Sequence, residues 1–413
     1  MKKFLFAIIL SIVSFNMIHA DVTWKLSEDG TLTISGTDMP NYYSYYSSKA
    51  PWLYKKDKIK KVVINNGVTN IGSAAFFGCS NITSVSIPKS VKSIGEWAFF
   101  ECVLTSVTIP NSVTSIGENA FLDCKKLTSI TLGNSVASIG ESAFCQCKAL
   151  TSVNIPNSVT KIGKEAFTNC EKLTSITLPN SLTTIEAFTF IGCSSLTSVT
   201  IPNSVTTIGN SAFSNCRELT SITIPKSVTS IGKKAFIGCS SLTSVTIPNS
   251  VTTIEAFTFS SCSRLTSVTI PNSVTTIEDS AFQGCTRLSS VTIPNSVTSI
   301  GNSVFENCFA LTSVTNLAKN PQKIGDKTFQ KSIGGKTYEI NGTLHVLPGC
   351  KAAYKAADYW KNFTIVEDAK EPGTTGVADV EADNGMKDGK YLIDDKVVIV
   401  RNGKKYNLNG IAE

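Results

Sequence analysis

The sequence contains very little histidine. Its 413 residues include two, His19 and His345, and we expect the first to be lost with a leader segment. Most hydrolytic, metal-dependent and acid–base mechanisms depend on imidazole groups. The carboxylates of Asp358, Glu367 and Asp368 near His345 are typical of a solvated surface, and no segment combines a nucleophile, a base and an orienting group. We therefore expect no catalytic residue, no cofactor and no metal site, and we do not expect an enzyme.

Long hydrophobic runs are also missing after the first 20 residues. A membrane-spanning helix needs about 18 or more consecutive apolar residues, and no later segment has them. The N-terminal segment has Lys2 and Lys3, a short apolar stretch from Phe4 to Val13, and Ala20 before a polar region, which is typical of a secretory signal peptide. We expect cleavage after Ala20, so that the mature chain is secreted or attached to the outer cell surface without a transmembrane helix.

Charge of one sign is not concentrated anywhere in the central region. Loss of Lys2 and Lys3 lowers the formal net charge from +7 to +5, and residues 67–318 hold 14 Lys and Arg against 13 Asp and Glu. A protein that binds nucleic acid needs basic residues gathered on one face. We therefore exclude nucleic acid as a partner.

An internal repeat organises most of the chain. A phenylalanine recurs every 23 residues, except between Phe99 and Phe121, where the interval is 22 because a turn after Cys102 is one residue shorter. Such a period predicts a solenoid, in which each unit buries its apolar side chains against its neighbours. The repeated phenylalanines are Phe76, Phe99, Phe121, Phe144, Phe167, Phe190, Phe213, Phe236, Phe259, Phe282 and Phe305.

One unit, residues 216–238, shows how a turn of the solenoid is expected to fold. Polar and apolar residues alternate from Ser221 to Pro225, which predicts a strand with one buried face that ends at the proline. A second short β-like run follows, and Phe236 and Cys239 are expected in one helical or 3₁₀ turn on the far side. The predicted fold class is an α/β solenoid of the leucine-rich-repeat type, strand-rich, with a parallel sheet and capped ends.

Eleven of the thirteen cysteines occupy one repeat position. Stacked side chains that point the same way are poorly placed for disulfides, so we interpret them as a buried column of thiols. No C-x-x-C pair is present, which argues against zinc. The redox state of Cys145 and Cys350, which fall outside the column, stays open. The column consists of Cys79, Cys102, Cys124, Cys147, Cys170, Cys193, Cys216, Cys239, Cys262, Cys285 and Cys308.

Glycine follows the repeat isoleucine in most units, but Glu186, Glu255 and Glu278 replace it. Glutamate would be costly in a left-handed backbone conformation, so this position is expected to need a compact bend and not a positive φ. The same six residues, I-E-A-F-T-F, occur at 185–190 and 254–259, which we interpret as duplication of a block of three units.

The repeat motif L-T-S-[IV]-T-I-P-x-S-V-T-x-I-[GE]-x-x-A-F-x-x-C resembles the BspA-type leucine-rich repeats of bacterial surface proteins. Residues 21–66 are similar to the N-terminal cap of that family, and residues 319–368 to its closing cap, with repeats from 67 to 318 between them. The resemblance implies an exported surface protein, and adhesins that bind host matrix or plasma proteins are among the family's members.

After a linker at residues 369–386, residues 387–413 contain short apolar runs and tight-turn sequences, which predict a small β tail. The tail resembles C-terminal segments of exported proteins from the same bacteria, and we expect a role in sorting or attachment.

Outward strand positions repeat as serine and threonine, which predicts ladders of hydroxyl groups on an exposed sheet. Threonine also favours strands for structural reasons, but we expect the face as a whole to bind a partner. The residues that vary after each cysteine, and the aromatic cluster of Tyr42, Tyr43, Tyr45 and Tyr46, are alternative locations, whereas Trp24 and Trp52 are expected to pack in the cap. The candidate binding face consists of Ser198, Thr200, Ser221, Thr223, Ser244, Thr246, Ser267, Thr269, Ser290 and Thr292.

The predicted function is protein–protein interaction at the cell surface, as in adhesion to host proteins or to proteins of neighbouring cells. The alternative is a surface glycan-binding protein of a nutrient-capture system, which would favour exposed aromatic platforms over hydroxyl ladders.

Overall fold

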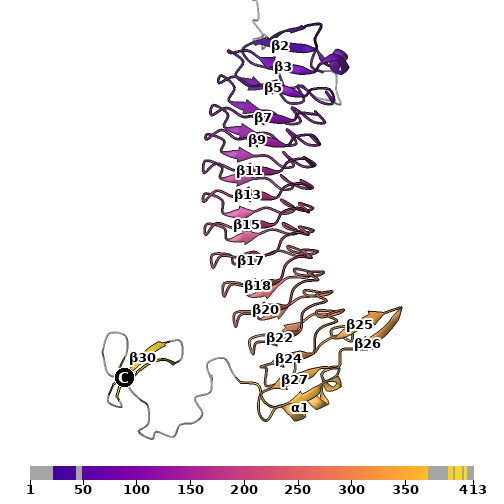
Figure 1. Cartoon of the computed structure of the whole chain (residues 1–413), viewed down its shortest axis with the longest axis vertical. Helices are drawn as coiled ribbons and strands as arrows, with labels where there is room; N and C mark the ends of the chain where they lie inside the picture. Colours follow the sequence, from indigo (N-terminus) through magenta and orange to yellow (C-terminus); the bar gives the residue numbers. More distant parts are fainter. Residues whose placement is uncertain (1–21, 43–48, 371–388, 394–395, 402–403, 407–413) are drawn as a thin grey trace, which may run out of the picture.

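The computed structural model describes residues 22–42, 49–370, 389–393, 396–401 and 404–406. Residues 22–42 and 49–370 form a parallel β-solenoid of about 13 turns with few helices, which confirms the predicted fold class (Figure 1). The number of turns exceeds the eleven repeats because strands of both caps continue the stack. Within the described residues, no helix combines the length and apolar character needed to cross a bilayer.

Most repeats contribute a first strand of three or four residues to what we name the first ladder. Its outward residues are polar and its inward residues are apolar, because successive side chains of a strand point to opposite faces. The strands are β5 (Ser84–Ser86), β7 (Ser106–Thr108), β9 (Ser129–Thr131), β11 (Ser152–Asn154), β13 (Ser175–Thr177), β15 (Ser198–Thr200), β18 (Ser244–Thr246), β20 (Ser267–Thr269), β22 (Ser290–Ile293) and β24 (Ser313–Asn316).

In most units a proline-containing turn leads from the first strand to a strand of two residues in the second ladder, whereas Gly133 takes the place of the proline after β9. These strands are β4 (Asn70–Ile71), β6 (Ser93–Ile94), β8 (Ser115–Ile116), β10 (Ser138–Ile139), β12 (Lys161–Ile162), β14 (Thr184–Ile185), β16 (Thr207–Ile208), β17 (Ser230–Ile231), β19 (Thr253–Ile254), β21 (Thr276–Ile277) and β23 (Ser299–Ile300).

The third side of each unit, which we name the phenylalanine turn, contains tight turns and no helix. Its amides bond three residues back, as in Cys239 N to Phe236 O at 3.2 Å, which is the bonding expected for a 3₁₀ turn. Residues with positive φ, such as Lys234 at 60° and Gly238 at 73°, stop these turns from continuing as a helix. Amides also bond to the next unit, as in Phe236 N to Thr258 O at 2.9 Å.

The core is a stack of phenylalanine rings beside a column of thiols. From Phe76 to Phe329 each ring is parallel to the next within 1–17°, with centroids 5.1–5.8 Å apart. Each fully buried phenylalanine contributes roughly 1.5–3 kcal/mol. From Cys102 to Cys308 every thiol of the column donates to the carbonyl oxygen of the phenylalanine one unit earlier, at 3.1–3.4 Å. The cysteines therefore fill space and also satisfy backbone acceptors between units.

Both caps extend the stack and close it with an indole. The N-terminal cap contains β1 (Val22–Leu26), β2 (Thr31–Gly36), η1 (Leu53–Lys58) and β3 (Lys61–Ile64). Trp52 is fully buried there and donates to the Ala75 carbonyl, as predicted for a cap residue. The C-terminal cap contains β25 (Gln330–Ile333), β26 (Lys336–Glu339), β27 (Thr343–Val346), α1 (Lys351–Ala356), η2 (Trp360–Asn362) and β28 (Thr364–Val366). Trp360 packs against the last ring of the stack, Phe329.

The expected β tail contains three antiparallel strands, β29 (Gly389–Ile393), β30 (Lys396–Arg401) and β31 (Lys404–Tyr406). The segment predicted as a signal peptide, three of the four clustered tyrosines (Tyr43, Tyr45 and Tyr46) and most of the predicted linker lie outside the described residues.

The bend after the second strand brings the backbones of neighbouring units very close together. A Cβ on Gly232 would lie 2.6 Å from the Asn210 nitrogen, and its φ is not positive, so a compact bend is what the position requires, as predicted. Glycines here donate to the isoleucine carbonyl of the preceding unit, as Gly232 does at 2.8 Å. Within the described residues, the amides of Glu186 and Glu255 make no such bond, and the second ladder is interrupted before each of them. Glu278, which follows Glu255 and not a glycine, does donate to the Ile254 carbonyl, at 2.9 Å. The second ladder is therefore interrupted where a glutamate stacks on a glycine of the preceding unit.

Candidate binding face

The outward side of the first ladder, which we name the strand face, carries all ten residues predicted as a binding face. Every one of them is exposed, and the apolar residues between them are turned inward. β18 and β20 pair in parallel register, with Ser244 beside Ser267 and Thr246 beside Thr269. The structure thus arranges the serines and threonines as two adjacent columns.

Other hydroxyl groups of the repeat stabilise the solenoid itself. Thr220 Oγ1 donates to the Thr197 carbonyl at 3.4 Å, and Ser227 Oγ donates to the Val205 carbonyl at 2.7 Å, with equivalents in most units. Within the described part of the chain, none of the ten strand-face hydroxyls forms a hydrogen bond to another protein group. The hydroxyls of the strand face are therefore available to a partner, whereas those of the flanking columns are already used between units.

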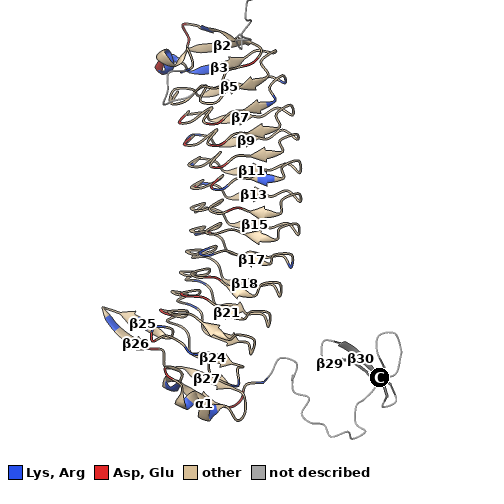
Figure 2. Cartoon of the chain, turned by 180° about the vertical axis from the view of Figure 1, so that it is seen from behind, with Lys and Arg blue, Asp and Glu red and all other residues tan. Residues whose placement is uncertain are grey.

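The strand face is also free of charge over most of its length. From Ser106 to Thr292 the two outward columns contain serine, threonine and one asparagine, Asn154. Figure 2 shows the strands of the repeat body mostly tan, with basic and acidic residues concentrated in the turns and caps. A partner of this face would be recognised by hydrogen bonds and shape, with little contribution from ion pairs.

A groove interrupts the strand face between residues 221–225 and β18. Thr223 forms a single bridge with Thr200, so the segment predicted as the strand of unit 216–238 keeps its alternation but joins no extended ladder. The groove has a volume of about 1230 Å³ and includes Ser221, Thr223, Ser244 and Thr246 among its lining residues. It lies at the junction where the second ladder is also interrupted, between β17 and β19. At the corresponding junction before Glu186 the first ladder stays paired between β11 and β13, so a glutamate at the bend does not by itself open the strand face.

The variable edge after each cysteine carries isolated surface charges. Lys125 pairs with Asp123 at 2.8 Å, and Lys148 pairs with Glu171 at 2.7 Å. Such exposed pairs contribute little to stability, at most about 1 kcal/mol. This edge therefore presents charge of both signs.

The C-terminal cap contains His345, the one histidine of the described residues. His345 Nδ1 lies 2.7 Å from an oxygen of Asp368, while Glu367 accepts a hydrogen bond from the Lys351 amide. Asp358 instead pairs with Lys361, which lowers the pKa of its carboxyl group. The acidic residues therefore act in separate surface contacts.

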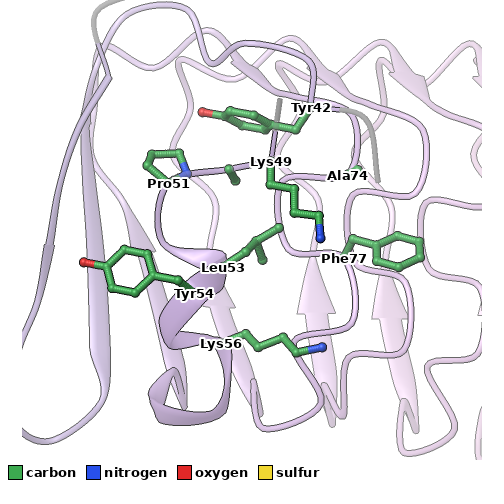
Figure 3. Close-up of a pocket in the computed structure, with 9 residues that line it drawn as sticks. Tyr42, Lys49, Pro51, Leu53, Tyr54, Lys56, Ala74 and Phe77 are labelled. Carbon is green, nitrogen blue, oxygen red and sulfur yellow. The ribbon is translucent and has the colours of Figure 1, made fainter. Parts of the chain in front are cut away.

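A pocket in the N-terminal cap was missed by the sequence analysis. It lies between η1 and the first repeat, has a volume of about 540 Å³, and is lined by Tyr42, Lys49, Leu53, Lys56 and Phe77, among others (Figure 3). Burial raises the pKa of Tyr42 to about 12, so its phenol is neutral near physiological pH. The signal that could have identified this region is the aromatic cluster of Phe77, Trp97 and Phe100, because later units carry mixed residues such as Thr168 and Ile191 at the position of Phe77.

The fold and the strand face define a leucine-rich-repeat solenoid of the kind that binds other proteins. The family model of the BspA type leucine-rich repeat region matches residues 51–172, 120–242, 160–287 and 206–336. Together these matches span more than half of the sequence. The chain belongs to the BspA-type leucine-rich repeat family.

Solved structures of similar proteins come from bacteria. A leucine-rich repeat protein from Bacteroides ovatus is 25% identical with a TM-score of 0.63, and the match covers 86% of this chain and 100% of that one. A leucine rich cell surface protein from Faecalibacterium prausnitzii is 29% identical with a TM-score of 0.43, covering 71% of this chain and 93% of that one. Among curated proteins, none matches this chain.

Proposed function

We propose that this protein is exported, remains at the cell surface, and binds another protein through the strand face, as in adhesion to host proteins or to proteins of neighbouring cells. The family to which it belongs consists of repeat proteins that generally act by binding other proteins. The observation that carries the proposal is the array of exposed hydroxyls on the strand face that make no hydrogen bond within the described residues. The protein acts without chemistry of its own.

The groove between residues 221–225 and β18 gives this flat surface a preferred docking point. Exposed hydroxyls line its rim, and buried apolar residues such as Ile222 and Val245 lie beneath them. Binding energy in protein interfaces is concentrated at the centre of the contact, where water is excluded. A loop of the partner that enters the groove would place its neighbouring segments along the hydroxyl columns.

The test is capture of surface and matrix proteins by the exported chain, compared with a variant that carries Thr223→Arg and Thr246→Arg. Both arginines would stand on the strand face and obstruct the groove, so capture should fall by about tenfold or more, which corresponds to about 1.4 kcal/mol. The matched control is Ser230→Arg, which adds the same side chain at an exposed position of the second ladder in the same unit. Equal capture by all three proteins would reject the strand face as the binding surface.

A glycan-binding function is the second candidate, because the first two repeats present an aromatic platform. Phe77, Trp97 and Phe100 lie together on the outside of the phenylalanine turns. Aromatic rings of this kind stack against the apolar faces of sugars. A glycan array probed with the same exported chain distinguishes this function from protein capture.

A further inference from the structure

The aromatic side chains of Phe77, Trp97 and Phe100 form a cluster on the outside of the first two phenylalanine turns, and Phe77 and Trp97 pack partly against the core. The ring centroids are 4.6 Å apart for Phe77 and Phe100, and 5.2 Å apart for Trp97 and Phe100, and all three side chains are partly exposed. Later units have Thr168 or Ser214 at the position of Phe77 and form the same turn. Exposed aromatic residues that the turn does not require indicate a surface that contacts something else.

The aromatic platform continues into the pocket of the N-terminal cap, because Phe77 belongs to both. The pocket of about 540 Å³ lies within the size range of small-molecule sites. In Figure 3 the side chains of Lys49 and Lys56 extend in the same direction, toward the side of the opening where Phe77 lies. The site thus combines a cavity, two ammonium groups at its opening and a ring surface beside it.

The two lysines differ from their neighbour Lys55, whose ammonium lies over the rings of Trp24 and Tyr54. Within the described residues, neither Lys49 nor Lys56 forms an ion pair. The carboxylate of Glu101 approaches the same glycine, Gly78, as the Lys56 ammonium, so it offsets part of the positive charge. The remaining charge at the opening favours an anionic ligand.

We propose that this pocket binds an acidic carbohydrate, with a ring carboxylate held between Lys49 and Lys56 and the next sugar stacked on Phe77 and Phe100. A sugar ring has an apolar face that suits aromatic stacking, and a carboxylate is the group that forms charge-assisted hydrogen bonds with ammonium donors. A neutral sugar would leave both lysines without a partner. The site is separate from the strand face and does not depend on the protein partner proposed there.

The test is isothermal titration of the exported chain with three probes. These are a tetrasaccharide that contains glucuronate, a sialylated trisaccharide, and a neutral glucose tetrasaccharide. We expect binding of at least one acidic probe and none of the neutral one, and the two acidic arms show whether the site takes a uronate or a sialate. Affinity should decrease in high salt, because the ion pairs at the opening are exposed.

Variants locate the site. The double change Lys49→Gln and Lys56→Gln should weaken binding by about tenfold or more, and Phe77→Ser should also weaken it. Lys126→Gln and Phe257→Ser, which alter an exposed lysine and a partly exposed aromatic residue elsewhere in the solenoid, are the matched controls. Because Lys49 and Lys56 are exposed, their double variant should fold even if Phe77→Ser does not.

Three results would overturn the proposal: equal binding of the neutral probe, unchanged affinity in the lysine double variant, or no binding of either acidic probe at millimolar concentration. The variant carrying Thr223→Arg and Thr246→Arg should keep its affinity for the acidic sugar. A loss of sugar binding there would place the site on the strand face and reject the pocket.

Discussion

The phenylalanine stack should be the most sensitive part of the solenoid to truncation. Phe213 is fully buried, and its ring stacks on Phe190 at 5.3 Å and on Phe236 at 5.5 Å. Removal of a buried phenylalanine side chain costs about 3–5 kcal/mol. We expect the loss of unfolding free energy in Phe213→Ala to lie near the upper end of this range, because the ring stacks on a neighbour on both sides and both contacts are lost.

The consequence should extend beyond the site, because a solenoid is stabilised mainly by contacts between neighbouring units. Urea unfolding followed by circular dichroism should show a lower midpoint for Phe213→Ala. Hydrogen exchange should increase most in the units that contain Phe190 and Phe236. A weakened central junction should also let the two halves of the stack unfold separately, which would broaden the transition.

The matched control is Phe188→Ala, which removes the same side chain from the outside of an adjacent turn. Phe188 is 38% exposed, and the equivalent position of the first repeat is already an alanine, Ala74, with positive φ. Its loss should cost less than about 1 kcal/mol. Equal destabilisation by Phe188→Ala and Phe213→Ala would refute the assignment of the stack as the core.

Three further predictions concern the thiols and the bends. Burial raises the pKa of the Cys262 thiol to about 12, whereas the pKa of an unfolded thiol is about 8.5. The free energy of unfolding should therefore be constant below about pH 8.5 and should fall as the pH rises toward 12, because only the unfolded thiol ionises in that range. An unchanged melting temperature at pH 10 would contradict this. Gly232→Ala should destabilise the chain by about 1–3 kcal/mol in urea unfolding, because the new Cβ would meet the Asn210 backbone, and wild-type stability would disprove the close approach. Cys216→Ala should lower the free energy of unfolding by about 1–2 kcal/mol, because it removes the donor to the Phe190 carbonyl. An unchanged free energy of unfolding would show that this hydrogen bond is unimportant for stability.

The 23-residue period was sufficient to predict the architecture, because each unit repeats the same apolar positions and can bury them only by stacking. The phenylalanine column, the thiol column and the outward hydroxyls all follow from that one pattern. The strand face could be located before the structure for the same reason, since alternation along a strand assigns each residue to a face.

Features that depend on contacts between units could not be predicted in the same way. Lys234 and Trp97 have positive φ, yet neither residue type signals such a conformation. Bonds to the next unit offset the strain, as in Lys234 N to Ala256 O at 3.0 Å. At the bend glycine, by contrast, the requirement is close approach of two backbones and not a positive φ, and the glutamates at the same position in other units made that predictable.

The groove and the pocket were missed because both arise from distances across unit boundaries. Both ladders are unpaired between residues 221–231 and the following unit, where the groove opens beside Ser244. The pocket joins Lys49 and Phe77, which lie on either side of η1 and β3 in the chain. The sequence showed that aromatic residues occur in the N-terminal cap, but it did not show which of their side chains face the same pocket.

The most direct test of the stacked core is alkylation of the folded chain with iodoacetamide at pH 8, followed by mass spectrometry of each cysteine. All eleven column cysteines, from Cys79 to Cys308, are buried with free thiols. They should stay unmodified without denaturant and react fully after unfolding in urea. Rapid labelling of these cysteines in the folded chain, or disulfides between them, would contradict the inward column on which the fold and the strand face both depend.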